Sequence, residues 1–402
     1  MTDKKYLKLK MTEKSVLNVY QKENPSTYRI EESEEEFVRV NAWMKKLFLK
    51  KLNFPDKMFS NSRLLDFGTG TGENSLHYIL NGANGTFVEM NKIACTRAEK
   101  IFSKYAPDSS QYEIINKSLF DFKTDTKYDI VTSLGVIHHT DDIKKAFKHK
   151  VSFLKKGGFI VLGIANSAGF FQRNLQRAII YHFTSEESQI AKLAEELFSS
   201  HLDRAEKYNG RTRKAIIYDT YVNPCINAPT TNELLKLFSN NSISLFSSWP
   251  PIKPPLLGDS VVSEDIKFDT ISNLMSLPEI IWMAHKENDI EYLLPLNNKL
   301  EKIIMPMNEI ANHLNYIKPQ TKINYNFMNE EIHKIIKNDF NSSDIFSPFI
   351  SSLNKLMEET KDLLVALEKN DLNEIKSIIE NSCILFKGTV GVGMNYYIGY
   401  KD

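Results

Sequence analysis

The sequence is poor in cysteine and has no long apolar segment. Its three cysteines, Cys95, Cys225 and Cys383, are far apart in a chain of 402 residues. They form no zinc-binding pattern and indicate a reducing compartment. No apolar run approaches the roughly 20 residues that a membrane-spanning helix needs, and residues 1–10 lack the apolar core of a signal peptide. We therefore expect a cytoplasmic protein without a membrane span and without a bound metal.

An excess of charge of one sign is also missing. The chain has 51 lysines and arginines against 50 aspartates and glutamates, which gives a net charge of +1. A protein that binds nucleic acid or an anionic membrane mainly through its charge would be strongly basic. The lysine-rich segment 45–51 fits the solvated face of an amphipathic helix, so we expect no nucleic-acid partner.

What the sequence does contain is a glycine-spaced turn after an apolar run. Residues 64–67 (LLDF) fit a buried parallel strand, and Gly68, Gly70 and Gly72 follow at alternate positions before a helical pattern. Glycine allows a tight turn and a close approach of the backbone to a ligand. The segment therefore predicts a nucleotide-binding corner, although such glycines also occur in ordinary turns.

A second strand, residues 86–90, carries a carboxylate near its end. Glu89 lies 17 positions after Gly72, which in a βαβ unit places it at the strand tip that faces the glycine turn. A carboxylate there accepts hydrogen bonds from both ribose hydroxyls; the alternative is a solvated glutamate at a strand end. An NAD enzyme typically has G-x-G-x-x-G and binds a pyrophosphate. The spacing here is G-x-G-x-G, and the corner contains no basic residue to hold a phosphate.

Strand and helix patterns continue to alternate along the chain. Segments 113–117, 127–134 and 158–164 fit strands. Alternating strands and helices with short connections predict a parallel, doubly wound α/β sheet. Before the last of these strands, apolar residues recur at helical spacing, namely Ile143, Ala146, Phe147, Val151 and Leu154.

Over residues 60–165 the sequence resembles the class I S-adenosylmethionine-dependent methyltransferases. The resemblance rests on the corner LLDFGTGTGE, on Glu89, on DIVTSLGVIHHTDD at 129–142 and on LKKGGFIVLGI at 154–164. The piece SLGVIHHT is especially similar to the ubiquinone-biosynthesis-type branch, which methylates mostly small molecules. The resemblance implies a Rossmann-like, doubly wound sheet of seven strands, with S-adenosylmethionine as the methyl donor and S-adenosylhomocysteine as the product.

The resemblance also implies which residues hold the cofactor. The family often has an acid after the third strand that binds the adenine amino group, and here Ser118 occupies that position. A hydroxyl also accepts a hydrogen bond, but the departure weakens the assignment. The residues expected to contact the cofactor are Asp66, Gly68, Thr69, Gly70, Gly72, Glu89, Met90, Ser118, Leu119, Ser133, Leu134 and Gly135.

Two histidines follow the fourth strand, where substrates of this family approach the methyl group. His139 and His138 are the candidate bases, because a neutral imidazole has a suitable pKa near neutrality. The alternative is a structural role for both, since positioning alone lowers a barrier by several kcal/mol and a base is not mandatory. The candidate substrate-binding residues are Tyr20, Tyr28, Asp219 and Tyr221.

The chain is expected to divide into several parts around the methyltransferase core. These are a helical arm or lid at 1–55, a core at 56–250 with a substrate-cap insertion at 166–229, a helical addition at 251–390, and a C-terminal strand at 391–402.

The tyrosine-rich C-terminus fits a strand that returns to the core sheet. Members of this family end in an antiparallel hairpin, so we predict that residues 394–401 pair with strand five and with the strand near 243–248. The helical addition is then inserted before the last strand. The segment GTVGVG at 388–393 lacks the Gly-Lys-Ser/Thr ending of a phosphate loop.

The predicted function is methyl transfer by in-line displacement to a nucleophilic O, N, C or S atom of a small-molecule metabolite. Two alternatives stay open at this point. One is a protein or nucleic-acid methyltransferase that uses the helical addition for recognition. The other is a non-catalytic scaffold that keeps the cofactor site.

Overall fold

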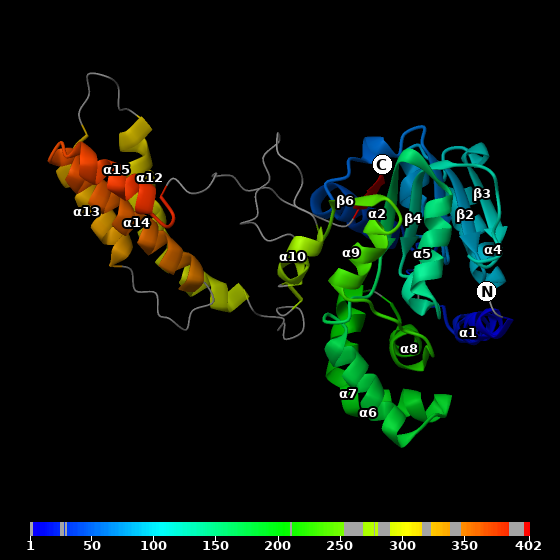
Figure 1. Cartoon of the computed structure of the whole chain (residues 1–402). Helices are drawn as coiled ribbons and strands as arrows, with labels where there is room; N and C mark the ends of the chain where they lie inside the picture. Colours follow the sequence, from blue (N-terminus) through cyan, green and yellow to red (C-terminus); the bar gives the residue numbers. More distant parts are fainter. Residues whose placement is uncertain are drawn as a thin grey trace. The chain divides into compact units, whose positions relative to one another are not determined.

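The structure is a computed structural model that describes residues 3–24, 28, 30–209, 211–252, 268–276, 278–279, 290–315, 323–337, 347–385 and 398–402. The chain divides into two compact units (Figure 1). Unit 1 consists of residues 1–284 and 393–402, and unit 2 consists of residues 285–392. Unit 2 is therefore inserted into the sequence of unit 1.

Seven strands of unit 1 form one mixed sheet with the order β3-β2-β1-β4-β5-β7-β6. Strands β1 to β5 run parallel to one another, and β7 pairs antiparallel with both β5 and β6. The strand order reverses between β1 and β4, which is where open α/β sheets form their ligand crevice. The strands are β1 (Arg63–Phe67), β2 (Asn84–Glu89), β3 (Tyr112–Asn116), β4 (Tyr128–Leu134), β5 (Leu154–Gly163), β6 (Ile243–Ser247) and β7 (Ile398–Lys401).

The predicted fold class is confirmed: this is the Rossmann-like seven-stranded sheet of methyltransferases, with a helical region before the last strand. The predicted strands agree with the observed ones except at the start of β5. Leu154, assigned from its spacing to the preceding helix, is the first residue of β5 and pairs with Tyr128 of β4. The helix before it, α5 (Ile143–Ser152), has already ended there.

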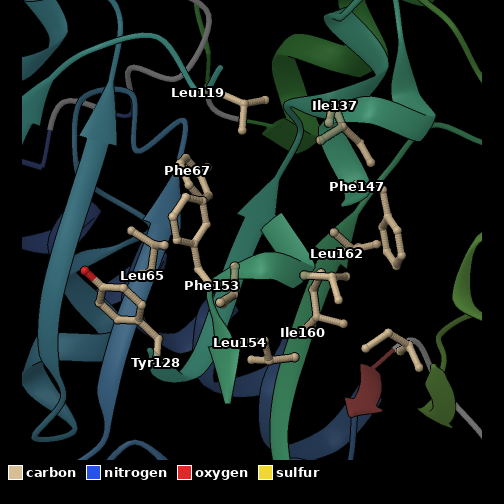
Figure 2. Packing of buried hydrophobic residues seen from close by; sticks show 14 of the residues in the cluster. Leu65, Phe67, Leu119, Tyr128, Ile137, Phe147, Phe153, Leu154, Ile160 and Leu162 are labelled. Carbon is tan, nitrogen blue, oxygen red and sulfur yellow. The ribbon is translucent and has the colours of Figure 1, made fainter. Parts of the chain in front are cut away.

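Helices cover both faces of the sheet. On one face, α5 and α9 (Thr231–Ser239) pack on a cluster that includes Leu65 and Phe67 (Figure 2). On the other face, a second cluster that includes Leu64 joins the sheet to α2 (Glu34–Lys45), α3 (Leu76–Leu80) and α4 (Lys92–Tyr105). Both sides of β1 are therefore buried, which explains why its sequence is mostly apolar.

The C-terminal strand lies inside the sheet, between β5 and β6. Ile398 is fully buried. A Cβ atom on Gly399 would lie 2.4 Å from Cγ2 of Ile243 and 2.9 Å from Cγ2 of Ile160, so this strand packs closely on both neighbours. The predicted return of the C-terminus is thus confirmed for 398–401. The predicted positions 394–397 and the segment 388–393 lie outside the described residues.

The helices between β5 and β6 pack together with the first helix of the chain. Val19 of α1 shares an apolar cluster with Ile180, Ile217 and Tyr221. Residues 218–222 form a π-helical continuation of α8. The helices of this group are α1 (Asp3–Lys22), α6 (Phe171–Phe183), α7 (Glu187–Asn209) and α8 (Arg213–Ile217).

Unit 2 has an apolar core of its own, which includes Ile303, Met328, Ile332 and Leu364. In the part of the chain that the structure describes, no helix is long and apolar enough to cross a bilayer. The helices of unit 2 are α12 (Ile290–Asn315), α13 (Tyr325–Ile336), α14 (Ser347–Glu368) and α15 (Leu372–Asn381), and α10 (Phe268–Met275) belongs to unit 1.

Candidate active site

The glycine turn after β1 has a backbone that only glycine adopts without strain. Gly68, Gly70 and Gly72 have φ angles of 78°, 59° and 86°. A Cβ atom on Gly68 would lie 2.3 Å from Cγ2 of Val136, and one on Gly72 would lie 2.9 Å from Cβ of Ala98. The turn therefore has no room for a side chain at Gly68 or Gly72.

A buried aspartate at the end of β1 supports this turn. The carboxylate of Asp66 accepts hydrogen bonds from Ser75 Oγ (2.6 Å), Thr132 Oγ1 (2.6 Å) and Thr69 Oγ1 (3.2 Å). Burial raises the pKa of Asp66, while the three hydroxyl donors act in the opposite direction. Asp66 thereby connects the turn to β4 and to the start of α3.

Glu89 faces the turn from the end of β2. Its carboxylate accepts a 2.9 Å hydrogen bond from the amide of Gly70 and a 2.8 Å hydrogen bond from the amide of Asn91. Burial raises the pKa of Glu89, and these backbone donors lower it. The two amides hold the carboxylate in one orientation beside the glycine turn.

A cavity of about 370 Å³ adjoins the turn and Glu89, within the range of about 300–1,000 Å³ that ligand pockets occupy. Gly135 in its wall has a φ of 77°, and a Cβ atom there would meet no atom within 4 Å. Its missing side chain therefore adds to the space. Of the predicted site residues, the wall contains Gly68, Gly70, Glu89, Met90, Leu119, Leu134, Gly135, His138, His139, Tyr20, Tyr28 and Asp219.

The ring of His139 is oriented by a backbone carbonyl. Nδ1 lies 2.8 Å from the carbonyl oxygen of Cys225 and 3.1 Å from Nδ2 of Asn223. The carbonyl is the closer group and only accepts, so we assign the proton of the neutral ring to Nδ1. The Nε2 atom then has the lone pair of the neutral ring, and it lies 4.0 Å from Oδ1 of Asp219. Asn223 completes the support, since its Oδ1 accepts from the Cys225 amide (3.0 Å) and its Nδ2 donates to the Tyr20 hydroxyl (2.8 Å).

Burial keeps both histidines neutral at physiological pH. Desolvation lowers the pKa of His139, and Asp219 and the Cys225 carbonyl act in the opposite direction. The pKa of His138 is lowered well below its usual value by burial and by His139. His138 accepts a hydrogen bond at Nδ1 from the amide of Ala165 (3.4 Å). A neutral imidazole with an accessible lone pair is the form that accepts a proton.

Residues 40–202 match the family of methyltransferase domains. This part of the chain is a class I S-adenosylmethionine-dependent methyltransferase domain. S-adenosylmethionine is accordingly its methyl donor, and the glycine turn, Glu89 and the space beside Gly135 fit that molecule. A search of the curated proteins gave no match.

Several solved structures are similar to the methyltransferase domain. One is magnesium protoporphyrin IX methyltransferase from Synechocystis with bound S-adenosylhomocysteine, at 15% identity and a TM-score of 0.33, covering 52% of this chain and 73% of that one. A possible histamine N-methyltransferase from Thermotoga maritima has 16% identity and a TM-score of 0.34, covering 60% and 86%. PKMT2 from Rickettsia typhi has 16% identity and a TM-score of 0.40, covering 61% and 48%.

Six of the predicted site residues do not line the cavity. Asp66, Thr69 and Gly72 form the framework of the turn, as described above. Ser133 donates to the carbonyl of Phe67 (3.3 Å) and accepts from the buried amine of Lys150. The remaining two are Ser118, whose hydroxyl donates to Glu13, and Tyr221, whose hydroxyl donates to Gln176 within the cluster of helices α6 to α8.

The sequence patterns missed several wall residues of the cavity. Glu13 and Val16 come from α1, and Arg211 comes from the segment before α8. Arg211 Nη1 forms an ion pair of 3.1 Å with Asp219 Oδ2. None of these residues belongs to a recognisable motif. In the described part of the chain, no group of three or more His, Cys, Asp or Glu side chains is placed to hold a metal ion.

Proposed function

We propose that the domain transfers the methyl group of S-adenosylmethionine to a nucleophilic O, N, C or S atom of a small-molecule metabolite by in-line displacement. The observation that carries the proposal is the position of His139. It lines the same cavity as the glycine turn and Glu89, and its protonated Nδ1 is already bonded to Cys225. The cavity thus combines a cofactor end with a proton acceptor.

The proposed roles at the cofactor end follow from the donors and acceptors of the wall. The Glu89 carboxylate accepts hydrogen bonds from the ribose hydroxyls. The backbone at Gly68, Gly70 and Gly135 accommodates the methionine part, because these positions have no side chain to exclude it. S-adenosylmethionine supplies a methyl carbon that its positively charged sulfur activates.

At the acceptor end, His139 takes the proton of the attacking nucleophile at Nε2. Asp219, 4.0 Å from that atom, stabilises the positive charge that the ring acquires, and Arg211 holds Asp219 in place. Tyr20 lies beside them, with its hydroxyl 3.4 Å from Asp219 Oδ1. A histidine in this role typically contributes about 10²–10⁴-fold to the rate.

The size of the cavity supports a small acceptor. Its volume of about 370 Å³ has to hold the cofactor as well as the acceptor, so the acceptor group that enters it is small. The chain has a net charge of +1, which provides no general attraction for nucleic acid. Cys95, Cys225 and Cys383 are all free thiols, consistent with the proposed reducing cytoplasmic compartment.

The proposal is tested with radiolabelled S-adenosylmethionine and a cell extract that has been separated into small molecules, protein and nucleic acid. We expect label in the small-molecule fraction. Transfer only to protein or nucleic acid would replace the proposed substrate class, and cofactor binding without transfer to any fraction would favour a scaffold. The control is Glu89→Ala, which removes a charge-assisted contact and should weaken S-adenosylhomocysteine binding by about 2 kcal/mol in calorimetry.

A further inference from the structure

The base of the cofactor has a defined place in the cavity if the cofactor binds as proposed. With the ribose at Glu89 on β2 and the methionine part at the turn after β1, the adenine extends toward the β3 side. There the wall contains Met90 and Leu119, whose side chains are apolar, and Glu13. This inference rests on the proposed function, because it assigns a part of the same cofactor site.

Ser118, the residue expected to bind the adenine amino group, is already engaged. Its hydroxyl donates to a carboxylate oxygen of Glu13 and accepts a 3.1 Å hydrogen bond from the amide of Phe120. Ser118 also does not line the 370 Å³ cavity. Its structural effect is to fix the position of Glu13, which does line the cavity.

Glu13 is held from two sides. Besides Ser118, Lys10 Nζ donates to Glu13 Oε2 at 2.8 Å, and the same amine bonds Asp121 Oδ2 at 2.6 Å. These contacts connect α1 to the loop after β3. The Glu13 side chain is 14% exposed, so its carboxylate is largely shielded from water at the end of the cavity.

We infer that Glu13 recognises the exocyclic amino group of the cofactor's adenine and thereby makes helix α1 a part of the cofactor site. An ionised carboxylate has about four acceptor positions and no donor, so Glu13 has capacity beyond the bonds to Ser118 and Lys10. The exocyclic amino group is a donor that meets this acceptor. A base with a carbonyl oxygen at the same position would bring two acceptors together and be rejected.

The test compares two ligands that differ at this edge of the base. One is S-adenosylhomocysteine, and the other is S-inosylhomocysteine, in which a carbonyl oxygen replaces the amino group and the neighbouring N1 carries a hydrogen. Calorimetry with the full-length wild type should give a preference for the adenosyl ligand of at least about tenfold, the value of one hydrogen bond to a charged group. Glu13→Gln should reduce this preference to about twofold or less, because an amide also donates to a carbonyl oxygen.

The matched control is Glu23→Gln, directly after the end of the same helix. Glu23 forms a 3.0 Å ion pair with Lys214 and does not line the cavity. This variant should keep the wild-type preference. Glu13→Ala adds a second measurement, since it removes the acceptor without supplying a donor and should weaken the adenosyl ligand selectively.

The outcomes separate the inference from the proposed function. The role of Glu13 would be overturned if its variants lose affinity for both ligands equally, or if the preference for the adenosyl ligand is unchanged. The proposed cofactor binding would stand in either case. A wild type that binds neither ligand would overturn the proposed cofactor site and the inference with it. A loss of preference in Glu23→Gln as large as in Glu13→Gln would assign the effect to docking of α1, and the recognition by Glu13 would be rejected.

Discussion

The ring of His139 is fixed at one nitrogen and faces a carboxylate at the other. The Cys225 carbonyl determines the tautomer, and Asp219 lies where a protonated Nε2 would need a negative charge. His138 differs, because its Nδ1 accepts from the Ala165 amide and its pKa is depressed further. At the residue scale, we therefore propose the base function for His139 and a supporting function for His138.

Replacing His139 should affect turnover much more than cofactor binding. We expect His139→Ala to lower kcat by about a hundredfold or more, because a general base contributes this much. The affinity for S-adenosylhomocysteine should change by less than about twofold, since the ring is proposed to contact the acceptor. Steady-state kinetics and calorimetry measure the two effects. His182→Ala on α6, an exposed histidine, is the control; a loss of cofactor affinity in His139→Ala would indicate a structural role.

The pH dependence of turnover should reveal the charge of Asp219. Asp219 raises the pKa of His139 against the larger effect of burial. Asp219→Asn removes this contribution, so the pKa of His139 falls further. The acidic limb of the profile of kcat/KM against pH should then move to lower pH. If the limb stays in place in this variant, the titrating base is another group.

At the scale of elements, a buried glutamate connects the N-terminal arm to the glycine turn. Glu73 accepts hydrogen bonds from the amide of Tyr28 (2.8 Å), the amide of Ile30 (3.4 Å) and Thr71 Oγ1 (2.8 Å). Burial outweighs these donors and raises the pKa of Glu73 from its ordinary value of 4.5 to about 7. Because Tyr28 lines the cavity, the protonation state of Glu73 affects the hydrogen bonds that position this part of the wall.

The raised pKa of Glu73 makes a prediction about stability. The folded state binds this proton more tightly than the unfolded state, so its contribution is complete below about pH 4.5 and is lost as pH rises through about 7. The wild type should lose on the order of 3 kcal/mol of unfolding free energy from this group across that interval. In Glu73→Gln the loss should be absent. Urea titrations at several pH values measure the difference, and parallel curves for the two proteins would contradict the prediction.

The last strand should be necessary for the fold of unit 1. β7 forms ladder hydrogen bonds with β5 and β6, and Ile398 is buried between them. Deleting residues 393–402 should abolish soluble expression. Gly399→Ala, a milder change in the full chain, should cost about 1–3 kcal/mol because its Cβ atom overlaps Ile243 and Ile160. A truncated protein that folds and binds S-adenosylhomocysteine normally would show that the strand is dispensable.

At the scale of the whole molecule, the two units have separate cores. Among the described residues, the sheet clusters and the α12–α15 cluster have no member in common, and the wall residues of the cavity all belong to unit 1. Unit 2 is nevertheless inserted before a strand that unit 1 needs. Unit 2 therefore contributes no described wall residue to the cofactor site, although the chain passes through unit 2 before it reaches β7.

Replacing residues 285–392 with a long flexible Gly/Ser linker should leave cofactor binding intact. We expect S-adenosylhomocysteine affinity within about twofold of wild type, because no described wall residue of the cavity belongs to unit 2. Calorimetry and circular dichroism measure binding and folding of the shortened chain. The shortened chain with an added Glu89→Ala change serves as the negative control. A folded protein without affinity would show that unit 2 supports the cofactor site.

The sequence by itself determined the features that depend on neighbouring residues. The glycine turn, the carboxylate at the end of β2 and the histidine pair after β4 are each set by a short pattern, because strand, turn and helix preferences act over a few residues. The return of the C-terminal strand was also predictable, but only through the resemblance to a family, since a four-residue strand has little local signal.

Only the tertiary structure decided which distant residues meet at the site. Cys225 orients a histidine 86 positions earlier, and Glu13 joins Ser118 across 105 positions. Packing of α1 and of helices α6 to α8 brings these groups together, and no local pattern encodes it. The same holds for Asp219 and Tyr221, which the sequence analysis grouped as substrate-binding candidates. Residues two apart on a helical turn do not face the same side, so Asp219 reaches the cavity while Tyr221 is buried in the helical core.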